Sequence, residues 1–186
     1  ETPARAAAGP SARRVWWRPI AGAAAALVVA AAIGWMALDG GASPAMAAPA
    51  ALARIHYDVA GGLAPHLKVA TVEEANTLLA EQSAGVVPIP ELPGSMKSCC
   101  LWTHAGTTLT CALIERDGRL ITVAVADGAE IHSPHGRTIT RDGRDFIAHA
   151  AGGINMVMAH KGERWLCVMG EAAIDELVEV AAGVRF

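Results

Sequence analysis

The stretch Cys99–Val125, CCLWTHAGTTLTCALIERDGRLITVAV, decides the fold expected for this chain. It holds three runs rich in apolar and β-branched residues, separated by the turn signals Ala105-Gly106 and Asp117-Gly118. Such runs, joined by dipeptides that contain Gly, predict antiparallel strands connected by tight hairpins. A three-stranded meander is therefore expected, with strands at Cys99–Thr103, Thr108–Ile114 and Leu120–Val125.

Toward the C-terminus, the pattern predicts a second hairpin that follows a long loop. Ile154–Ala159 and Arg164–Met169 are strand-like and flank a polar turn that contains Gly162. Residues 127–152, between the meander and this hairpin, are richer in Gly, His and charge. They predict a loop with at most a short strand near Phe146.

Three segments carry helix signals. Thr71 is a good N-cap and Glu74 follows it at capping-box spacing, which predicts a helix that ends near Gly85. A shorter helix is expected over Leu52–Val59. Apolar residues recur at helical spacing over about Ala172–Ala182, which predicts a closing helix.

The predicted fold class is α+β. Residues 51–186 are expected to form a small domain in which one or two helices pack on an antiparallel sheet of about five strands. The prolines from Pro88 to Pro93 predict an extended connector between the helical part and the sheet. The sheet needs a cover for its apolar face, so the core is expected beneath the helices. The residues predicted to be buried there are Leu113, Ile121, Val123, Val157 and Leu166.

An apolar segment, Ile20–Leu38, precedes this domain and reads IAGAAAALVVAAAIGWMAL without a charged residue. At about 1.5 Å per residue it covers about 28 Å, close to the hydrocarbon core of a bilayer. Backbone groups in lipid must be satisfied within the segment, so it is expected to be a transmembrane helix. Four arginines precede it and Asp39 follows it, so the positive-inside rule places the N-terminus in the cytoplasm. The expected organisation is a cytoplasmic stub at 1–18, a transmembrane helix at 19–39, a linker at 40–50 and an exported α+β domain at 51–186.

A cleaved signal sequence is the alternative to a retained anchor. Ala45-Met46-Ala47 fits a small-x-small cleavage site, and Arg13-Arg14 resembles part of a twin-arginine signal. The apolar run is longer than the core of an ordinary signal peptide, which favours the anchor. The expected location is therefore the bacterial inner (cell) membrane. The protein would cross it once, with its C-terminal domain periplasmic or otherwise extracytoplasmic.

The cysteines are the candidate site residues, at positions Cys99, Cys100, Cys111 and Cys167. Disulfides are permitted outside the cytoplasm. In the hairpin that turns at Ala105-Gly106, Cys100 lies opposite Cys111, within the Cα separation that a disulfide accepts. A slip of one residue would substitute Cys99, and Cys167 from a later strand could also pair. We predict at least one disulfide, structural or redox-sensing, that joins Cys111 to Cys99 or Cys100.

Other chemistry has less support in the sequence. Met96, Cys99, Cys100 and His104 suit a soft metal such as copper(I), but no C-x-x-C or H-x-x-x-H motif accompanies them. No G-x-S-x-G or P-loop pattern is present, so we expect no catalytic residue, no metal and no cofactor, and predict that the chain is not an enzyme. A net charge of −3 argues against a nucleic-acid partner.

Two blocks of the sequence resemble a known family. The first runs from Leu92-Pro93 through SMKSCCLWTHAGTTLTCALIERDGRLITVAV, and the second is INMVMAHKGERWLCVMGEAAIDELVEVA. They are similar to the exported domain of membrane-bound anti-sigma factors, which regulate extracytoplasmic-function sigma factors. The shared pattern is a proline-rich lead-in, a Cys-bearing strand, strands joined at Gly turns and a short final helix. The resemblance covers residues 52–182, together with the preceding anchor.

The resemblance implies a sigma factor as partner, with one departure from the family pattern. The family binds its sigma factor through a cytoplasmic N-terminal helical domain, often with an H-x-x-x-C-x-x-C zinc motif. Residues 1–18 contain neither His nor Cys. The expectation is that such a domain lies upstream of Glu1 or that this protein lacks one, and no sigma-binding residue is assigned.

Two functions are therefore expected to compete. The first is a single-pass membrane regulator of transcription, of anti-sigma-factor type, whose exported domain senses or binds a partner in the envelope. The second is an anchored or secreted non-enzymatic binding module that responds to a metal or to redox conditions. Cleavage after Ala47 would favour the second, because a released domain cannot signal through the membrane.

Reporter fusions after Leu38 test the predicted orientation. Alkaline phosphatase, which becomes active only outside the cytoplasm, should be active at that position because the arginines hold the N-terminus inside. A fluorescent protein that folds only in the cytoplasm should be dark at the same position. The reverse pair of results would refute the orientation.

Overall fold

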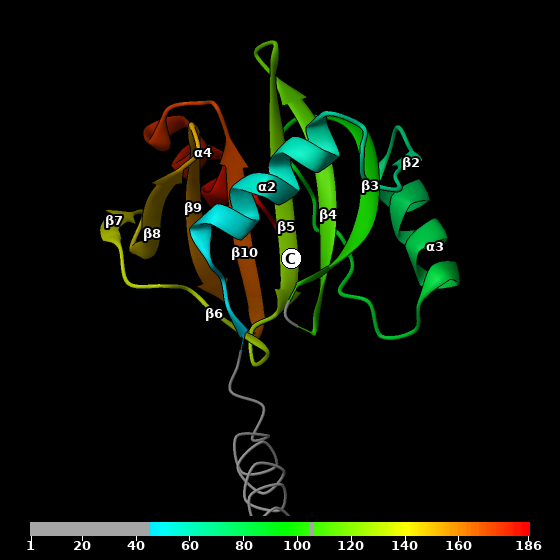
Figure 1. Ribbon diagram of the computed structural model, residues 1–186, viewed down its shortest axis with the longest axis horizontal. Helices are drawn as coiled ribbons and strands as arrows, with labels where there is room; N and C mark the ends of the chain where they lie inside the picture. The colour runs from blue at the N-terminus through cyan, green and yellow to red at the C-terminus, as the bar shows by residue number, and fades with distance from the viewer. Residues whose placement is uncertain (1–44, 105) are drawn as a thin grey trace, which may run out of the picture. The chain divides into compact units, whose positions relative to one another are not determined.

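The computed structural model describes residues 45–104 and 106–186, and this part confirms the α+β class. It contains an eight-stranded antiparallel sheet in the order β2-β3-β4-β5-β10-β9-β8-β7, with three helices (Figure 1). The helices are α2 (Pro49–Ala60), α3 (Val72–Gln82) and α4 (Ile174–Gly183). The sheet strands are β2 (Leu67–Lys68), β3 (Ser95–His104), β4 (Thr107–Arg116), β5 (Arg119–Asp127), β7 (Arg137–Arg141), β8 (Arg144–Ala151), β9 (Ile154–Lys161) and β10 (Arg164–Gly170). A separate parallel pair is formed by β1 (Ala45–Met46) and β6 (Ile131–His132).

The predicted number of about five strands is too low because the long loop expected at 127–152 contains a hairpin and because the two-residue edge strand β2 was not predicted. β7 and β8 pair in antiparallel register around Asp142-Gly143. Asp142 and Gly143 have positive φ values of 52° and 72°, the conformation that a tight hairpin turn of this type requires. β7 is an edge strand with the sequence RTITR, and charged side chains are common on edges because they discourage further pairing. Its polar composition therefore resembles that of a loop.

The sheet is covered on both faces, as Figure 1 shows, with α2 crossing in front of it and α4 lying behind it. Ala112 of β4 belongs to the core cluster that includes α3, and Val123 of β5 belongs to the cluster that includes α4. These two residues are directly opposite each other in the sheet, so α3 and α4 cover the same face. α2 covers the other face, where it shares a cluster with buried residues of β3, β4, β5, β9 and β10.

The local helix signals are confirmed. The Thr71 hydroxyl accepts a hydrogen bond from the backbone N–H of Glu74, at 3.2 Å, and caps α3. Asn76 of α3 then holds the extended connector through two hydrogen bonds to the backbone of Ile89. The connector is also tied to the C-terminus, because Glu91 and Arg185 exchange backbone hydrogen bonds.

The predicted stub at 1–18 and transmembrane helix at 19–39 lie outside the described residues. Within 45–104 and 106–186, no helix is long and apolar enough to cross a membrane. Part of the predicted linker at 40–50 is folded, since β1 pairs with β6 and α2 begins at Pro49. Proline suits this position because the first helical residues need no N–H donor. The folded part therefore begins before the predicted boundary at Ala51.

All five residues predicted to form the core are buried, and one of them allows a matched stability test. Ile121 is 0% exposed, whereas its neighbour Leu120 is 39% exposed. Replacing Ile121 with Ala should lower the free energy of unfolding by about 2–5 kcal/mol, because it removes buried methyl groups and leaves a cavity. Leu120→Ala should stay within about 0.5 kcal/mol of the native chain. Denaturant unfolding measures both, and equal losses would contradict the facing of β5.

Candidate functional site

Three cysteines lie in one row across the sheet face that α2 covers. Cys100 of β3 is directly opposite Cys111 of β4, which is opposite Ala124 of β5, which in turn is opposite Cys167 of β10. Directly opposite residues point to the same face, and all four belong to one core cluster. The cysteines are 2%, 0% and 0% exposed, in that order. The row is therefore a sealed part of the core beneath α2.

Cys99 lies on the other face of the sheet. Successive strand residues alternate between faces, and Cys99 packs in the cluster that includes Ala75 and Leu79 of α3. Its opposite residue is Ala112, which belongs to the same cluster. Cys99 is therefore separated by the sheet itself from the row that contains Cys111.

The register leaves one pair of cysteines that a disulfide could join. Directly opposite residues have Cα atoms about 4.5–5.5 Å apart, within the range of about 4.4–6.8 Å that disulfides accept. Cys167 is two strands from Cys111, a separation of about 10 Å, which is too far. The predicted facing of Cys100 and Cys111 is confirmed, and Cys99 is excluded as a partner. Both thiols of the pair are free in the structure, so the bond itself stays a prediction.

The thiols of the row differ in how readily they ionise. Hydrogen bonding with Cys111 lowers the pKa of Cys100. The same interaction, together with burial, raises the pKa of Cys111. Burial raises the pKa of Cys167 as well, and burial with the neighbouring Cys100 raises the pKa of Cys99 to about 11. Since the thiolate is the nucleophile in disulfide chemistry, Cys100 is the thiol best placed to react first.

The copper(I) group considered from the sequence is divided between the two faces. Met96 and Cys99 belong to the cluster that includes α3, whereas Cys100 lies on the α2 face and His104, four residues along the strand, shares that face. In the described part of the chain, no three or more His, Cys, Asp or Glu side chains are grouped so that they could hold a metal ion. These four residues therefore do not form a joint ligand set.

A cavity of about 440 Å³ lies at the C-terminal end of α2, and none of the four cysteines lines it. His56 is 4% exposed, and its Nδ1 is 2.9 Å from the hydroxyl of Thr122 on β5. Tyr57 donates a hydrogen bond of 2.7 Å to the carbonyl of Gly152, in the turn between β8 and β9. These two contacts hold α2 against the sheet. The residues that line the cavity are His56, Tyr57, Ala60, Gly61, Gly118, Arg119, Leu120 and Glu171.

Burial lowers the pKa of His56, and the nearby Glu171 opposes this effect in part. The neutral imidazole is therefore the form that fits beneath α2. The sequence pattern does not reveal this site, because a single His on an amphipathic helix has no recognisable spacing. Its one available signal is the His56-Tyr57 pair on a short helix, which includes the single tyrosine of the chain.

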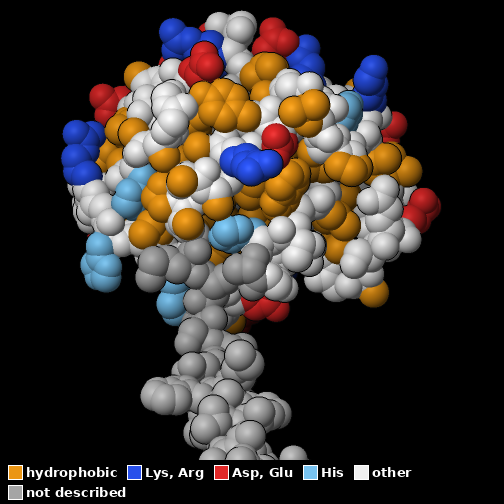
Figure 2. Space-filling model, in the orientation of Figure 1, with side chains coloured by type: hydrophobic (Ala, Val, Ile, Leu, Met, Phe, Trp, Pro, Cys, Tyr) orange, Lys and Arg blue, Asp and Glu red, His pale blue; other side chains and the backbone are white. Residues whose placement is uncertain are grey.

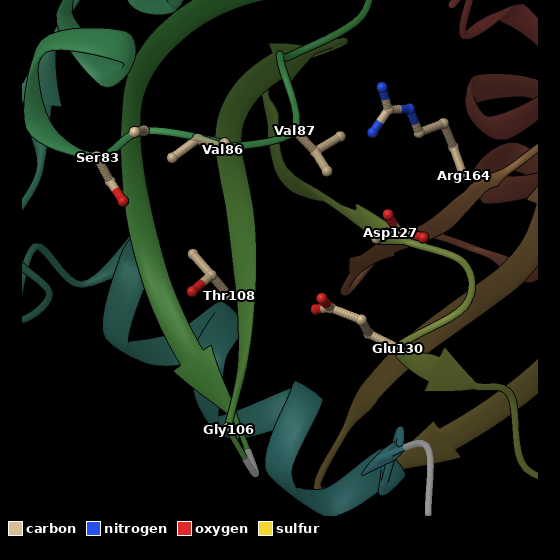
Figure 3. A pocket seen from close by; sticks show the side chains of 10 residues that line it. Ser83, Val86, Val87, Gly106, Thr108, Asp127, Glu130 and Arg164 are labelled. Carbon is tan, nitrogen blue, oxygen red and sulfur yellow. The ribbon is translucent and has the colours of Figure 1, made fainter. Parts of the chain in front are cut away.

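A second cavity, of about 230 Å³, is polar and lies at the opposite end of β5. Figure 3 shows Asp127, Glu130 and Arg164 around it, with the segment Ser83–Val87 closing one side. Two hydrogen bonds to backbone carbonyls hold this region. The Thr107 hydroxyl donates to the carbonyl of Glu130, and the Gly128 N–H donates to the carbonyl of Glu163. The two carboxylates outnumber the one guanidinium, so the charged lining of this cavity is acidic on balance.

The outer surface on the α2 side is apolar for an exposed face. Figure 2 shows hydrophobic side chains gathered over this side of the domain, with few charged groups among them. Tyr57, Leu63 and Leu120 are 46%, 78% and 39% exposed, and two of these residues line the α2 cavity. Exposed apolar side chains at a cavity suit contact with another molecule.

Comparisons with protein-family models, with curated proteins and with solved structures found no match for this chain. The resemblance to anti-sigma exported domains therefore stays a prediction.

Acidification should destabilise the domain through His56. Its pKa is lowered below 6.5 in the folded chain, so below pH 6.5 the unfolded chain binds a proton that the folded chain does not. The free energy of unfolding should therefore fall as the pH drops from 7 to 5, and the fall should be smaller in His56→Gln. Denaturant unfolding at each pH gives the comparison.

Two further histidines serve as references for this test. His135 is exposed, so His135→Gln is a surface control that should change the free energy of unfolding at pH 7 by less than about 0.5 kcal/mol. The pKa of His160 is also lowered, by burial and by His132, and His160 accounts for part of the fall that remains in His56→Gln. If the free energy of unfolding of His56→Gln fell with pH as steeply as that of the native chain, His56 would not control the pH dependence of stability.

Proposed function

We propose that the chain is a single-pass membrane regulator of anti-sigma-factor type, and that its C-terminal domain is exported and senses conditions or binds a partner in the envelope. The chain acts without enzymatic activity or a bound cofactor. Its signalling partner is a sigma factor, held by a cytoplasmic part of the full protein. The α2 side of the domain is the sensing face.

The position of α2 is the observation that carries this proposal. α2 is the first helix of the described domain, and only the short strand β1 is described between it and the segment predicted to contain the membrane anchor. Its contacts with Thr122 and Gly152 join it to the sheet face that holds the buried cysteines and to the edge of the larger cavity. A change at that face therefore acts on the helix of the described domain that is nearest in sequence to the predicted anchor.

Two further features support a binding role over catalysis. Among the described residues, the nucleophilic thiols are buried in the core, and neither cavity brings a thiol together with a base. The exposed apolar side chains of Tyr57 and Leu120, which line the larger cavity, are of the kind that proteins use for contact. The resemblance of residues 52–182 to anti-sigma exported domains agrees with both features.

The alternative, a released binding module, would require cleavage near Ala47. Ala47 is 0% exposed, and its backbone N–H donates to the carbonyl of His132. Cleavage after Ala47 would remove β1 and this buried residue from the folded domain. N-terminal sequencing of the mature protein from the envelope decides, and a start at Ala48 would favour the released module.

Copurification tests the regulatory function. The full product of the native gene, extracted from bacterial membranes with a mild detergent, should carry a sigma factor at about one to one. A version without the exported C-terminal domain should still bind that sigma factor, because the partner is held in the cytoplasm. Transcription from promoters of that sigma factor should then no longer respond to envelope conditions. A full-length protein that carries no sigma factor would overturn the anti-sigma function.

A further inference from the structure

The Cys100–Cys111 pair combines close facing with complete burial. The two residues are directly opposite on neighbouring strands, and the other two cysteines are excluded by face or by distance. They share a cluster with Ile55 and Val59 of α2 and with Ala64, which follows the helix. An oxidant therefore reaches the sulfurs only when this cover moves.

We propose that Cys100 and Cys111 form a reversible dithiol–disulfide switch, which a small-molecule disulfide oxidises when α2 and the segment after it lift from the sheet. The switch deepens the proposed function, on which it rests, by naming the signal that the exported domain senses. The disulfide forms only after α2 has lifted from the sheet in an oxidising compartment, so its presence reports that event.

The chemistry is two successive thiol–disulfide exchanges. The Cys100 thiolate attacks one sulfur of the external disulfide, forms a mixed disulfide and releases one thiolate. The Cys111 thiol gives its proton to the released thiolate and attacks the sulfur of Cys100, which expels the second thiolate. The second thiolate takes up a proton from water, which replaces the proton that Cys100 lost to water on ionising. Two protein thiols and one small disulfide thus become one protein disulfide and two small thiols. Excess small thiol reverses both steps.

The cover over the pair makes α2 the gate of this reaction. A mixed disulfide adds a whole molecule to a sulfur whose residue is 2% exposed, and the packed cluster holds no space for it. The first exchange must therefore occur in an open form. Contacts that hold α2 down, such as the hydrogen bond from Tyr57 to Gly152, should slow the oxidation.

Thiol mapping of the full chain tests the pairing. The chain is purified in detergent with reductant, transferred to buffer with oxidised glutathione, alkylated and digested with trypsin. Ser98–Arg116 then carries three of the four cysteines, and Trp165–Arg185 carries Cys167. In a Cys99→Ser variant, the first peptide should become lighter by two hydrogen atoms and should not be alkylated. Reduced glutathione in excess should restore two alkylated thiols.

The remaining variants show whether the bond is the one proposed. Cys100→Ser and Cys111→Ser should each abolish the loss of thiols, whereas Cys167→Ser should leave it unchanged. A protein that keeps four alkylated thiols in oxidised glutathione would overturn the switch. A bridge that links Ser98–Arg116 to Trp165–Arg185 would overturn it too, because the register forbids Cys167 as partner.

The rate of oxidation tests the gate. Tyr57→Phe removes one hydrogen bond from α2 and should speed the loss of thiols about fivefold, the factor expected for one ordinary hydrogen bond. Arg54→Gln alters a side chain on the same helix that is 82% exposed, and should leave the rate unchanged. Equal rates in Tyr57→Phe and the native chain would overturn the gating. These assays involve no sigma factor, so a failed copurification with an intact switch would remove only the anti-sigma function.

Discussion

Two tight turns set the register of β3, β4 and β5, and this register decides which face of the sheet every side chain in the centre occupies. Asp117 and Gly118 adopt positive φ values of 52° and 74°, which fixes how β4 pairs with β5. A slip of one residue in either hairpin would exchange the two faces of a strand. It would place Cys99 under α2 and move Cys100 to the side of α3. The chemistry available to the domain therefore depends on the turns.

Covering both faces of the sheet has a chemical consequence for the cysteines. A strand with one wet face would expose every second residue, whereas Cys99 and Cys100 are adjacent and both are buried. Each thiol is in a dry environment, but only Cys100 has a thiol neighbour directly opposite it. Neighbouring residues of the same type thus acquire different reactivity from their positions alone.

α2 links the buried pair to the larger cavity. His56 and Tyr57 hold the helix to β5 and to the β8–β9 turn, and they also line the cavity. Protonation of His56, occupation of the cavity and oxidation beneath the helix would all act on the same docked element. By linkage, any of these three changes that favours the form with α2 lifted from the sheet also favours each other change that requires that form.

Local sequence signals determined the elements that have strong local causes. The cap at Thr71, the Asp117-Gly118 turn, the proline connector and the opposite placement of Cys100 and Cys111 all follow from short-range geometry. A short strand near Phe146 was allowed for and is present as β8, but its partner β7 was missed because an edge strand needs no apolar pattern. The α2 cavity was missed because it joins residues from α2, the β4–β5 turn and the segment after β10. Only the tertiary structure decided that Cys99 and Cys167 are out of reach of Cys111. That outcome depends on strand order and on which helix covers which face, and no local pattern encodes either.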